Sequence, residues 1–179
     1  MVLFTVDTCV LIALQKDEPE HDIDSIRQLF RAALTGRVCL QLTAAFERDC
    51  VRNIQTTGAV QRAEDLLDWV SGQPVMPERA GGAFRLDVST FGGDDLVCDE
   101  EMVELSDRLE ALLPEPKVKR SRQDVAYRYS DIDHLLAHHL SKADAFVTID
   151  RATILDFQKD LESLGLTVCT PAEAVRMLS

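Results

Sequence analysis

The fold is predicted by the opening stretch of the chain, Val2-Leu3-Phe4-Thr5-Val6-Asp7. Its first five residues are β-prone and largely apolar, which predicts a strand that enters the core at once. The dense apolar run at 8–14 predicts a buried helix, so Asp7 lies at the junction of strand and helix. In open α/β sheets, ligands bind at this carboxyl edge. Asp7 is therefore either a helix N-cap, which is the commoner role, or a functional carboxylate.

The composition indicates an ordinary soluble protein of one domain, because the 179 residues are 46% hydrophobic and 28% charged. No run has the length of a membrane span, and no basic region precedes the first apolar stretch. We therefore expect neither a signal peptide nor a membrane anchor. The five cysteines include no CxxC pair. They favour buried thiols in a reducing cytoplasm over disulfides or a zinc site.

Strands alternate with helices along the chain. After the strand at 2–6, apolar runs predict strands at 38–42, 145–149 and 166–169. Helical spacing predicts helices at about 22–34, 43–53, 59–70, 102–112, 130–140 and 151–164. A last helix should follow Thr170-Pro171-Ala172-Glu173, which combines an N-cap, a first-turn proline and a capping-box glutamate. The alternation predicts an α/β fold with a central parallel sheet and helices on both faces.

The pattern breaks down between 74 and about 100, where glycine pairs and an acidic stretch replace the apolar spacing. A short run at 84–88 is a candidate for an extra edge strand. We interpret this segment as an insertion, a lid or a partner surface within a single domain that spans 1–179.

The formal charge of −12 argues against a nucleic-acid partner, because Lys and Arg dominate binding to polyphosphates. That objection weakens if many carboxylates converge on a divalent cation, which inverts the local sign. One dense basic cluster is present, and Arg128 follows it. Its members are Lys117, Lys119, Arg120 and Arg122. The cluster is either a solvated loop or a contact to a phosphate backbone.

Acidic residues recur where predicted strands meet helices. Asp7 and Asp150 each follow an apolar strand directly, Glu47 lies early in the helix after the second strand, and Asp133 lies in the helix before the strand that delivers Asp150. In a parallel sheet whose outer elements flank the Asp7 strand, all four can meet at one edge. Such carboxylates repel and raise one another's pKa, so a hard divalent cation is the simplest compensation.

Oxygen ligands of this kind suit Mg²⁺ or Mn²⁺, with phosphates completing the shell. The predicted chemistry is metal-assisted hydrolysis of a phosphodiester. Each acid also has a structural alternative. Asp150 can cap its helix, Asp133 can complete a capping box with Ser130, and Glu47 can face solvent. Four separate caps would have no reason to fall at one end of one sheet, so the joint pattern favours a metal site.

The chain resembles the PIN-domain nucleases. The resemblance lies in Val6-Asp7-Thr8, in the segment 43–48, and above all in 131–137 followed by 143–150. It implies a five-stranded parallel sheet in an α/β/α sandwich and Mg²⁺- or Mn²⁺-dependent cleavage of RNA. By the same resemblance, the acidic positions of the family fall on Asp7, Glu47, Asp133 and Asp150, with Thr8 and Thr148 as hydroxyl neighbours.

Small PIN-domain proteins include the VapC-like toxins. The resemblance therefore also implies a possible role in a toxin–antitoxin pair, with an antitoxin protein as partner and a homodimer as the usual assembly. The chain is longer than the usual toxin, and its segment 74–125 has no counterpart that we can assign. A related PIN-domain ribonuclease is the alternative.

Asp131 competes with Asp133 for the third acidic position. The family pattern, an acid followed by a small apolar helical segment, fits Asp133 better. Asp131 would lie about 200° away around the helix. We therefore take Asp133 as the ligand and Asp131 as the fallback. Asp144 precedes its strand and should lie at the opposite edge, in a structural role.

Other classes fit less well. A haloacid-dehalogenase-like phosphatase needs a second Asp two residues after the first, and this position is Cys9. His134 and His138 have a spacing suited to zinc but lack the accompanying Glu of an HExxH motif, so we expect a surface or core-edge role. The remaining alternative is a PIN-like module that binds RNA or protein without turnover.

Overall fold

The computed structural model describes residues 1–43, 45–51, 57–80, 100–114 and 122–179, and the statements below refer to these. Within them, some positions, including Glu47, Arg122 and Arg128, are described by their backbone alone. No helix of these ranges is both long and apolar enough to cross a membrane.

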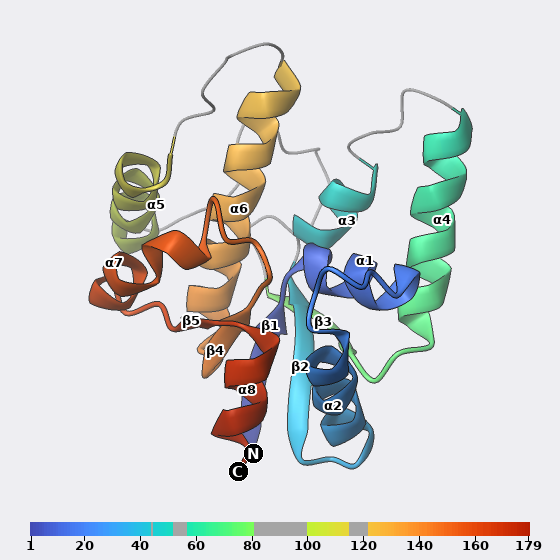
Figure 1. Cartoon of the computed structure of the whole chain (residues 1–179). Helices are drawn as coiled ribbons and strands as arrows, with labels where there is room; N and C mark the ends of the chain where they lie inside the picture. Colours follow the sequence, from blue (N-terminus) through green and yellow to red (C-terminus); the bar gives the residue numbers. More distant parts are fainter. Residues whose placement is uncertain (44, 52–56, 81–99, 115–121) are drawn as a thin grey trace.

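A five-stranded sheet forms the centre of the molecule, in the order β3-β2-β1-β4-β5. The strands are β1 (Val2–Val6), β2 (Val38–Thr43), β3 (Met76–Ala80), β4 (Ala145–Val147) and β5 (Val168–Cys169). Every neighbouring pair is parallel. The opening strand is thus the central one, and the chain adds strands first on one side of it and then on the other (Figure 1).

Helices cover both faces of the sheet. They are α1 (Thr8–Lys16), α2 (Ile23–Leu34), α3 (Ala45–Val51), α4 (Thr57–Ser71), α5 (Glu100–Leu112), α6 (Arg122–Ser141), α7 (Gln158–Ser163) and α8 (Pro171–Met177), with a short 3-10 turn η1 (Leu155–Phe157). One buried cluster joins the sheet to α1, α2, α4 and α8, and a second joins it to α5, α6 and α7. The predicted α/β sandwich with a central parallel sheet is therefore confirmed.

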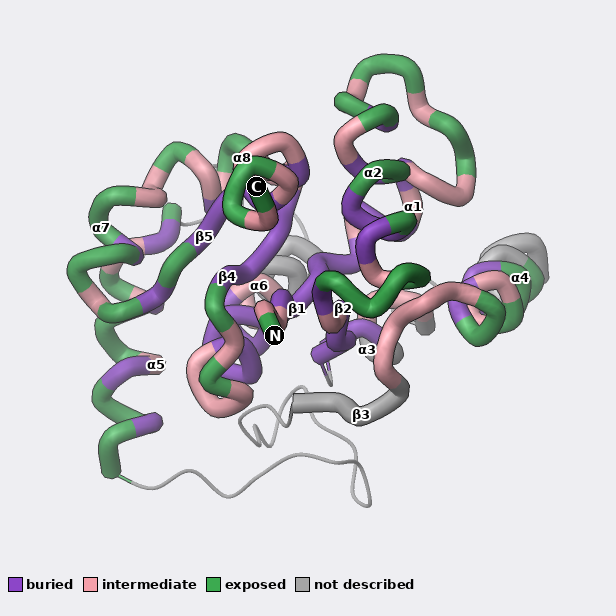
Figure 2. The backbone as a smooth tube through the Cα atoms, turned by 90° about the horizontal axis from the view of Figure 1, so that it is seen from below, coloured by how far each residue is buried: buried purple, intermediate pink, exposed green. Residues whose placement is uncertain are grey.

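Burial follows this layering. Figure 2 shows β1 and β4 buried at the centre, whereas α5, α7 and α8 carry exposed residues on their outer sides. Phe4 and Val6 of β1 are fully buried, as the apolar opening run predicts. Burial of side chains of this size stabilises the fold by about 1.5–3 kcal/mol each.

Helix caps explain where several elements begin. The Asp7 side chain accepts a hydrogen bond from the backbone N–H of Cys9 and caps α1. Asp22 caps α2 in the same way through Ser25. The predicted capping box of α8 is present, because Thr170 and Glu173 bond each other's backbone N–H groups.

The segment predicted to be an insertion contributes a strand. β3 lies within it and pairs with β2, with Gln41 opposite Met76. Its sequence, Met-Pro-Glu-Arg-Ala, lacks the apolar alternation of a central strand. As an edge strand with one neighbour it tolerates the proline, which is why its pattern was missed. The candidate edge strand at 84–88 lies outside the described residues.

Two predicted helices have different boundaries. α6 begins at Arg122 instead of 130, so Ser130 is inside the helix and the capping-box alternative for Asp133 is wrong. The helix predicted at 151–164 is interrupted, with turns at 151–154, then η1, then α7. The cause is local: Asp150 accepts hydrogen bonds from both the backbone and the hydroxyl of Thr153, which favours a turn over a helix.

Candidate functional site

The strand register brings Asp7 and Thr148 together. Val6 lies opposite Val147, so the residue that follows each strand emerges at the same carboxyl edge. The backbone N–H of Asp7 donates to the carbonyl of Val147, at 3.0 Å. The Thr148 hydroxyl donates to Oδ2 of Asp7 at 2.6 Å. Asp7 is thus a helix cap whose carboxylate is also fixed by the neighbouring strand.

Asp150 is joined to this pair through Thr148. Its backbone N–H donates to Thr148 Oγ1 at 3.0 Å. Its own carboxylate accepts from Thr153, at 3.1 Å from the backbone nitrogen and 2.6 Å from the hydroxyl. Asp150 therefore stabilises a turn where a helix cap was the expected alternative, and it is linked to Asp7 through the hydroxyl of Thr148.

Asp131 is the acid of α6 that joins this edge. Burial raises its pKa to about 8, and so do the charges of Asp7, Asp150 and Asp49, while His134 lowers it. Asp133, two residues further along the helix, is fully buried. Asp131, the fallback of the sequence analysis, is thus the acid of α6 whose charge is coupled to Asp7 and Asp150, and Asp133 stays a prediction. Residues two apart on a helix point about 200° away from each other, and α6 turns Asp131 toward the strand ends.

His134 is the centre of a buried polar network. Its Nε2 lies 2.8 Å from Oδ2 of Asp49 and 4.0 Å from Oδ1 of Asp7. Its Nδ1 lies 2.5 Å from the hydroxyl of Thr43, at the end of β2. Burial lowers the pKa of His134, but the hydrogen bond to Asp49 and the charges of Asp49, Asp7 and Asp131 outweigh burial and raise it above its ordinary value.

Asp49 on α3 was not predicted. It accepts hydrogen bonds from Thr8 at 3.1 Å, from Ser130 and from His134. Glu47, the predicted acid of this helix, is placed by its backbone two residues earlier. The sequence signal for Asp49 was the second acid on a short helix that follows a strand. It was missed because only the first was considered.

The two histidines of α6 each contact a strand threonine. His138 is buried and its Nδ1 lies 2.8 Å from the hydroxyl of Thr5 in β1. Burial, followed by the charge of His139, lowers the pKa of His138 to about 4. Since His134 is buried as well, the surface role is wrong for both residues, and of the two expected roles the core-edge one is compatible with their burial. The Nδ1 atom of each ring lies within hydrogen-bond distance of a strand threonine, Thr5 for His138 and Thr43 for His134.

One chain of hydrogen bonds resembles a nucleophile, a base and an orienting acid. It runs from the hydroxyl of Thr43 through the ring of His134 to the carboxylate of Asp49. Thr43 is fully buried, however. Its hydroxyl therefore has no access to a substrate, and covalent catalysis by this line of residues is excluded on steric grounds.

The carboxylates share an electrostatic environment without forming a tight shell. Among the described residues, one group of three potential ligands has its donor atoms within 4.8 Å of one another, namely Glu18, Glu20 and His21. That group lies in the turn between α1 and α2, where Glu18 also pairs with Lys16 and His21. Glu18 thus has partners within the turn itself.

The chemistry of the edge nevertheless fits a hard cation. Burial raises the pKa of Asp131, and the charges of Asp7, Asp150 and Asp49 raise it further. A donor set of carboxylate oxygens is the one that Mg²⁺ and Mn²⁺ prefer. The carboxylates would have to draw closer to hold the ion. The positive charge of the ion would then offset the repulsion that raises the pKa of Asp131.

No protein-family model matches the chain, and no curated protein matches it.

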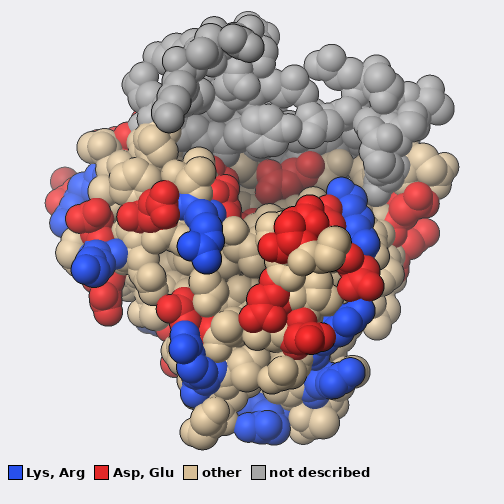
Figure 3. Space-filling model, in the orientation of Figure 1, with Lys and Arg blue, Asp and Glu red and all other residues tan. Residues whose placement is uncertain are grey.

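The basic residues are only partly placed. Lys117, Lys119 and Arg120 lie outside the described residues, and Arg122 and Arg128 are placed on α6 by their backbone. On the face in Figure 3, acidic side chains are prominent over the middle and upper part, and Lys and Arg gather at the narrow lower end.

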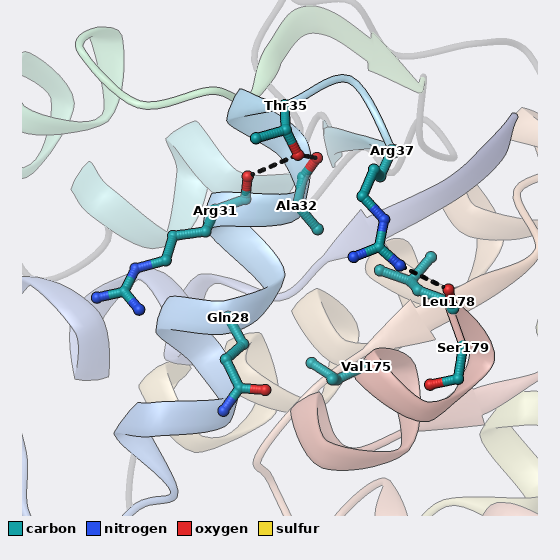
Figure 4. Close-up of a pocket in the computed structure, with 8 residues that line it drawn as sticks. All are labelled: Gln28, Arg31, Ala32, Thr35, Arg37, Val175, Leu178 and Ser179. Carbon is teal, nitrogen blue, oxygen red and sulfur yellow. Dashed lines mark hydrogen bonds between the residues drawn. The ribbon is translucent and has the colours of Figure 1, made fainter.

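A hollow near the termini is a separate feature. It has a volume of about 470 Å³ and lies between α2 and α8 (Figure 4). Arg37 donates to the carbonyl of Leu178 at 2.8 Å, which ties the end of α8 to the start of β2. This hollow is at the opposite edge of the sheet from Asp7, and Arg37, one of its two arginines, has a structural partner.

Proposed function

We propose that the protein is a Mg²⁺- or Mn²⁺-dependent endoribonuclease of the PIN type. The observation that carries the proposal is the hydrogen-bonded link between Asp7 and Asp150 through Thr148 at the carboxyl edge of the central strand, and the coupling of Asp131 to both acids supports it. These three acids would hold the cation. Glu47 stays a candidate ligand on the strength of the sequence resemblance.

A bound divalent ion would lower the pKa of the attacking water and stabilise charge on the phosphate oxygens. The chain's own residues provide orientation. Thr148 holds Oδ2 of Asp7, and the N–H of Cys9 holds Oδ1, at 3.3 Å. Both oxygens of Asp7 thus keep a fixed direction while each retains lone-pair capacity for a cation.

The test is cleavage of labelled single-stranded and hairpin RNA by the full chain, with Mg²⁺, with Mn²⁺ and with EDTA. Asp7→Asn should abolish cleavage and leave thermal unfolding close to that of the wild type. Asp144→Asn is the matched control. Asp144 accepts from the N–H of Leu3 at the opposite edge, at 2.8 Å, as predicted, so this variant should cleave normally. Cleavage by Asp7→Asn at the wild-type rate would show that the site is wrong.

A second candidate is a PIN-like module that binds RNA or protein without turnover. Two observations favour it: both oxygens of Asp150 are engaged by Thr153, and the edge carboxylates are not among the closely spaced groups. RNA binding by the wild type, with no cleavage at any concentration of either metal, would support this module and exclude the nuclease.

The biological setting is a further proposal that rests on the sequence resemblance. A cytoplasmic toxin of the VapC type, acting as a homodimer and silenced by an antitoxin, is one setting, and a stand-alone nuclease is the other. A small DNA-binding protein encoded next to this chain would favour the toxin. Co-purification of that protein with this chain would establish the partner.

A further inference from the structure

The two buried histidines of α6 form a natural matched pair. They are one helical turn apart, and their rings lie 5.9 Å and 6.0 Å from the ring of Phe146. Each also contacts a strand threonine: Thr43 for His134 and Thr5 for His138. The two residues differ at the second ring nitrogen. Among the contacts described, only His134 has carboxylates there, those of Asp49 and Asp7.

Asp49 is held on three sides by this network. His134 comes from α6, and so does the hydroxyl of Ser130, while Thr8 comes from the first turn of α1. Thr8 directly follows Asp7 in the chain. An ionised carboxylate only accepts hydrogen bonds, so His134 must carry its hydrogen on Nε2. The contact therefore has a defined direction, from α6 to α3.

His134 also lies between two acids that would otherwise repel each other. Its Nε2 is 2.8 Å from Asp49 and 4.0 Å from Asp7. Its other nitrogen is anchored on β2, the strand next to that of Asp7. The ring is thus fixed by the sheet at one end and presents its N–H to the carboxylates at the other.

We propose that His134 is a positioning residue that fixes Asp49 and, through Thr8 and its own Nε2, sets the orientation of Asp7 toward a divalent cation. The inference rests on the proposed function, since it assigns a role beside the same site. Partners that orient metal-binding carboxylates typically change metal affinity by about 10- to 100-fold when they are removed.

The experiment measures Mn²⁺ binding to the full chain by calorimetry, with thermal unfolding measured in parallel. His134→Phe should weaken Mn²⁺ binding by about 10- to 100-fold. His138→Phe removes an equally buried ring and one hydrogen bond, and should leave the Mn²⁺ affinity within about twofold of wild type. His134→Gln supplies an N–H near the position of Nε2 and should restore a large part of the affinity.

Asp49→Asn addresses the same contact if His134→Phe does not fold, and it should weaken Mn²⁺ binding by at least tenfold. Wild-type affinity in either His134→Phe or Asp49→Asn overturns the positioning role. Equal losses in His134→Phe and His138→Phe also overturn it, because they indicate a general packing effect. A wild type that binds no Mn²⁺ and cleaves no RNA removes the proposed function itself, and the positioning role with it.

Discussion

Thr148, at the end of β4, donates its hydroxyl hydrogen to Oδ2 of Asp7, at the end of β1, over 2.6 Å. Both residues are buried, and 141 positions separate them in the chain. Thr148→Val keeps the side-chain shape but leaves the carboxylate without this donor. We expect the free energy of unfolding to fall by about 1–3 kcal/mol, measured by denaturant titration. Thr148→Ser, which retains the hydroxyl, should recover most of this loss. If Thr148→Val unfolds like the wild type, the hydrogen bond contributes nothing.

Asp131 and Asp133 can be separated by parallel substitution. Asp131→Asn removes a charge that Asp7 and Asp150 oppose, so the protein in EDTA should unfold at a higher temperature than the wild type at pH 8. The same variant should lose most of its stabilisation by added Mn²⁺. Asp133→Asn should keep the response to Mn²⁺, because residues two apart on α6 point about 200° away from each other. Scanning calorimetry with and without Mn²⁺ tests both variants. Loss of the Mn²⁺ response in Asp133→Asn, with the response kept in Asp131→Asn, would identify Asp133 as the site residue.

His138 should make stability depend on pH. Its pKa is about 4 in the folded protein against 6.5 for the unperturbed group. Above pH 6.5 both states are neutral and the residue contributes nothing to the dependence. Below it, the unfolded chain binds a proton that the folded chain does not, so stability falls by about 2–3 kcal/mol between pH 6.5 and 4.5.

The matched variant for this effect is His138→Phe, which cannot bind the proton. Its free energy of unfolding should fall less steeply over the same pH range, by about the same 2–3 kcal/mol. The measurement is denaturant unfolding at a series of pH values for both proteins. Parallel curves would show that His138 takes up its proton equally in the folded and unfolded states.

The capping box of α8 offers a test that does not involve the site. Thr170→Ala removes the hydroxyl that accepts from the N–H of Glu173 at 3.3 Å. The free energy of unfolding should drop by about 1 kcal/mol. Mn²⁺ binding should be unchanged, since α8 packs on α2 at the other face of the sheet from α6. A loss of metal affinity in this variant would mean that the carboxyl edge is coupled to α8.

Some of the architecture could be predicted because its signals are local. The opening run and the run at 145–149 predicted strands that form the centre of the sheet, and the Thr170–Glu173 pattern predicted a cap. β3 could not be predicted in this way. Its pairing with β2 depends on a neighbour 35 residues away, with Gln41 opposite Met76, and its own sequence carries little strand preference.

The candidate site likewise has residues that local sequence signals predict and residues that only distant contacts bring into place. Sequence alone placed Asp7 directly after its strand, and this holds; Asp150 comes three residues after the end of β4, because that strand is two residues shorter than predicted. It also named Thr8 and Thr148 as neighbours, and both hydrogen-bond to site carboxylates. The rotation of a helix about its own axis is not local information, because it depends on which face packs against the sheet.

That rotation decided what the sequence could not. It turned Asp131 and His134 toward the strand ends and buried Asp133, and it brought Ser130 onto Asp49 of a different helix. The sequence by itself determined the parallel sheet and the two acids at its edge, since periodicity and chain order suffice for these. Only the tertiary structure decided which side chains of α3 and α6 complete the network, because contacts between helices follow from packing across the core.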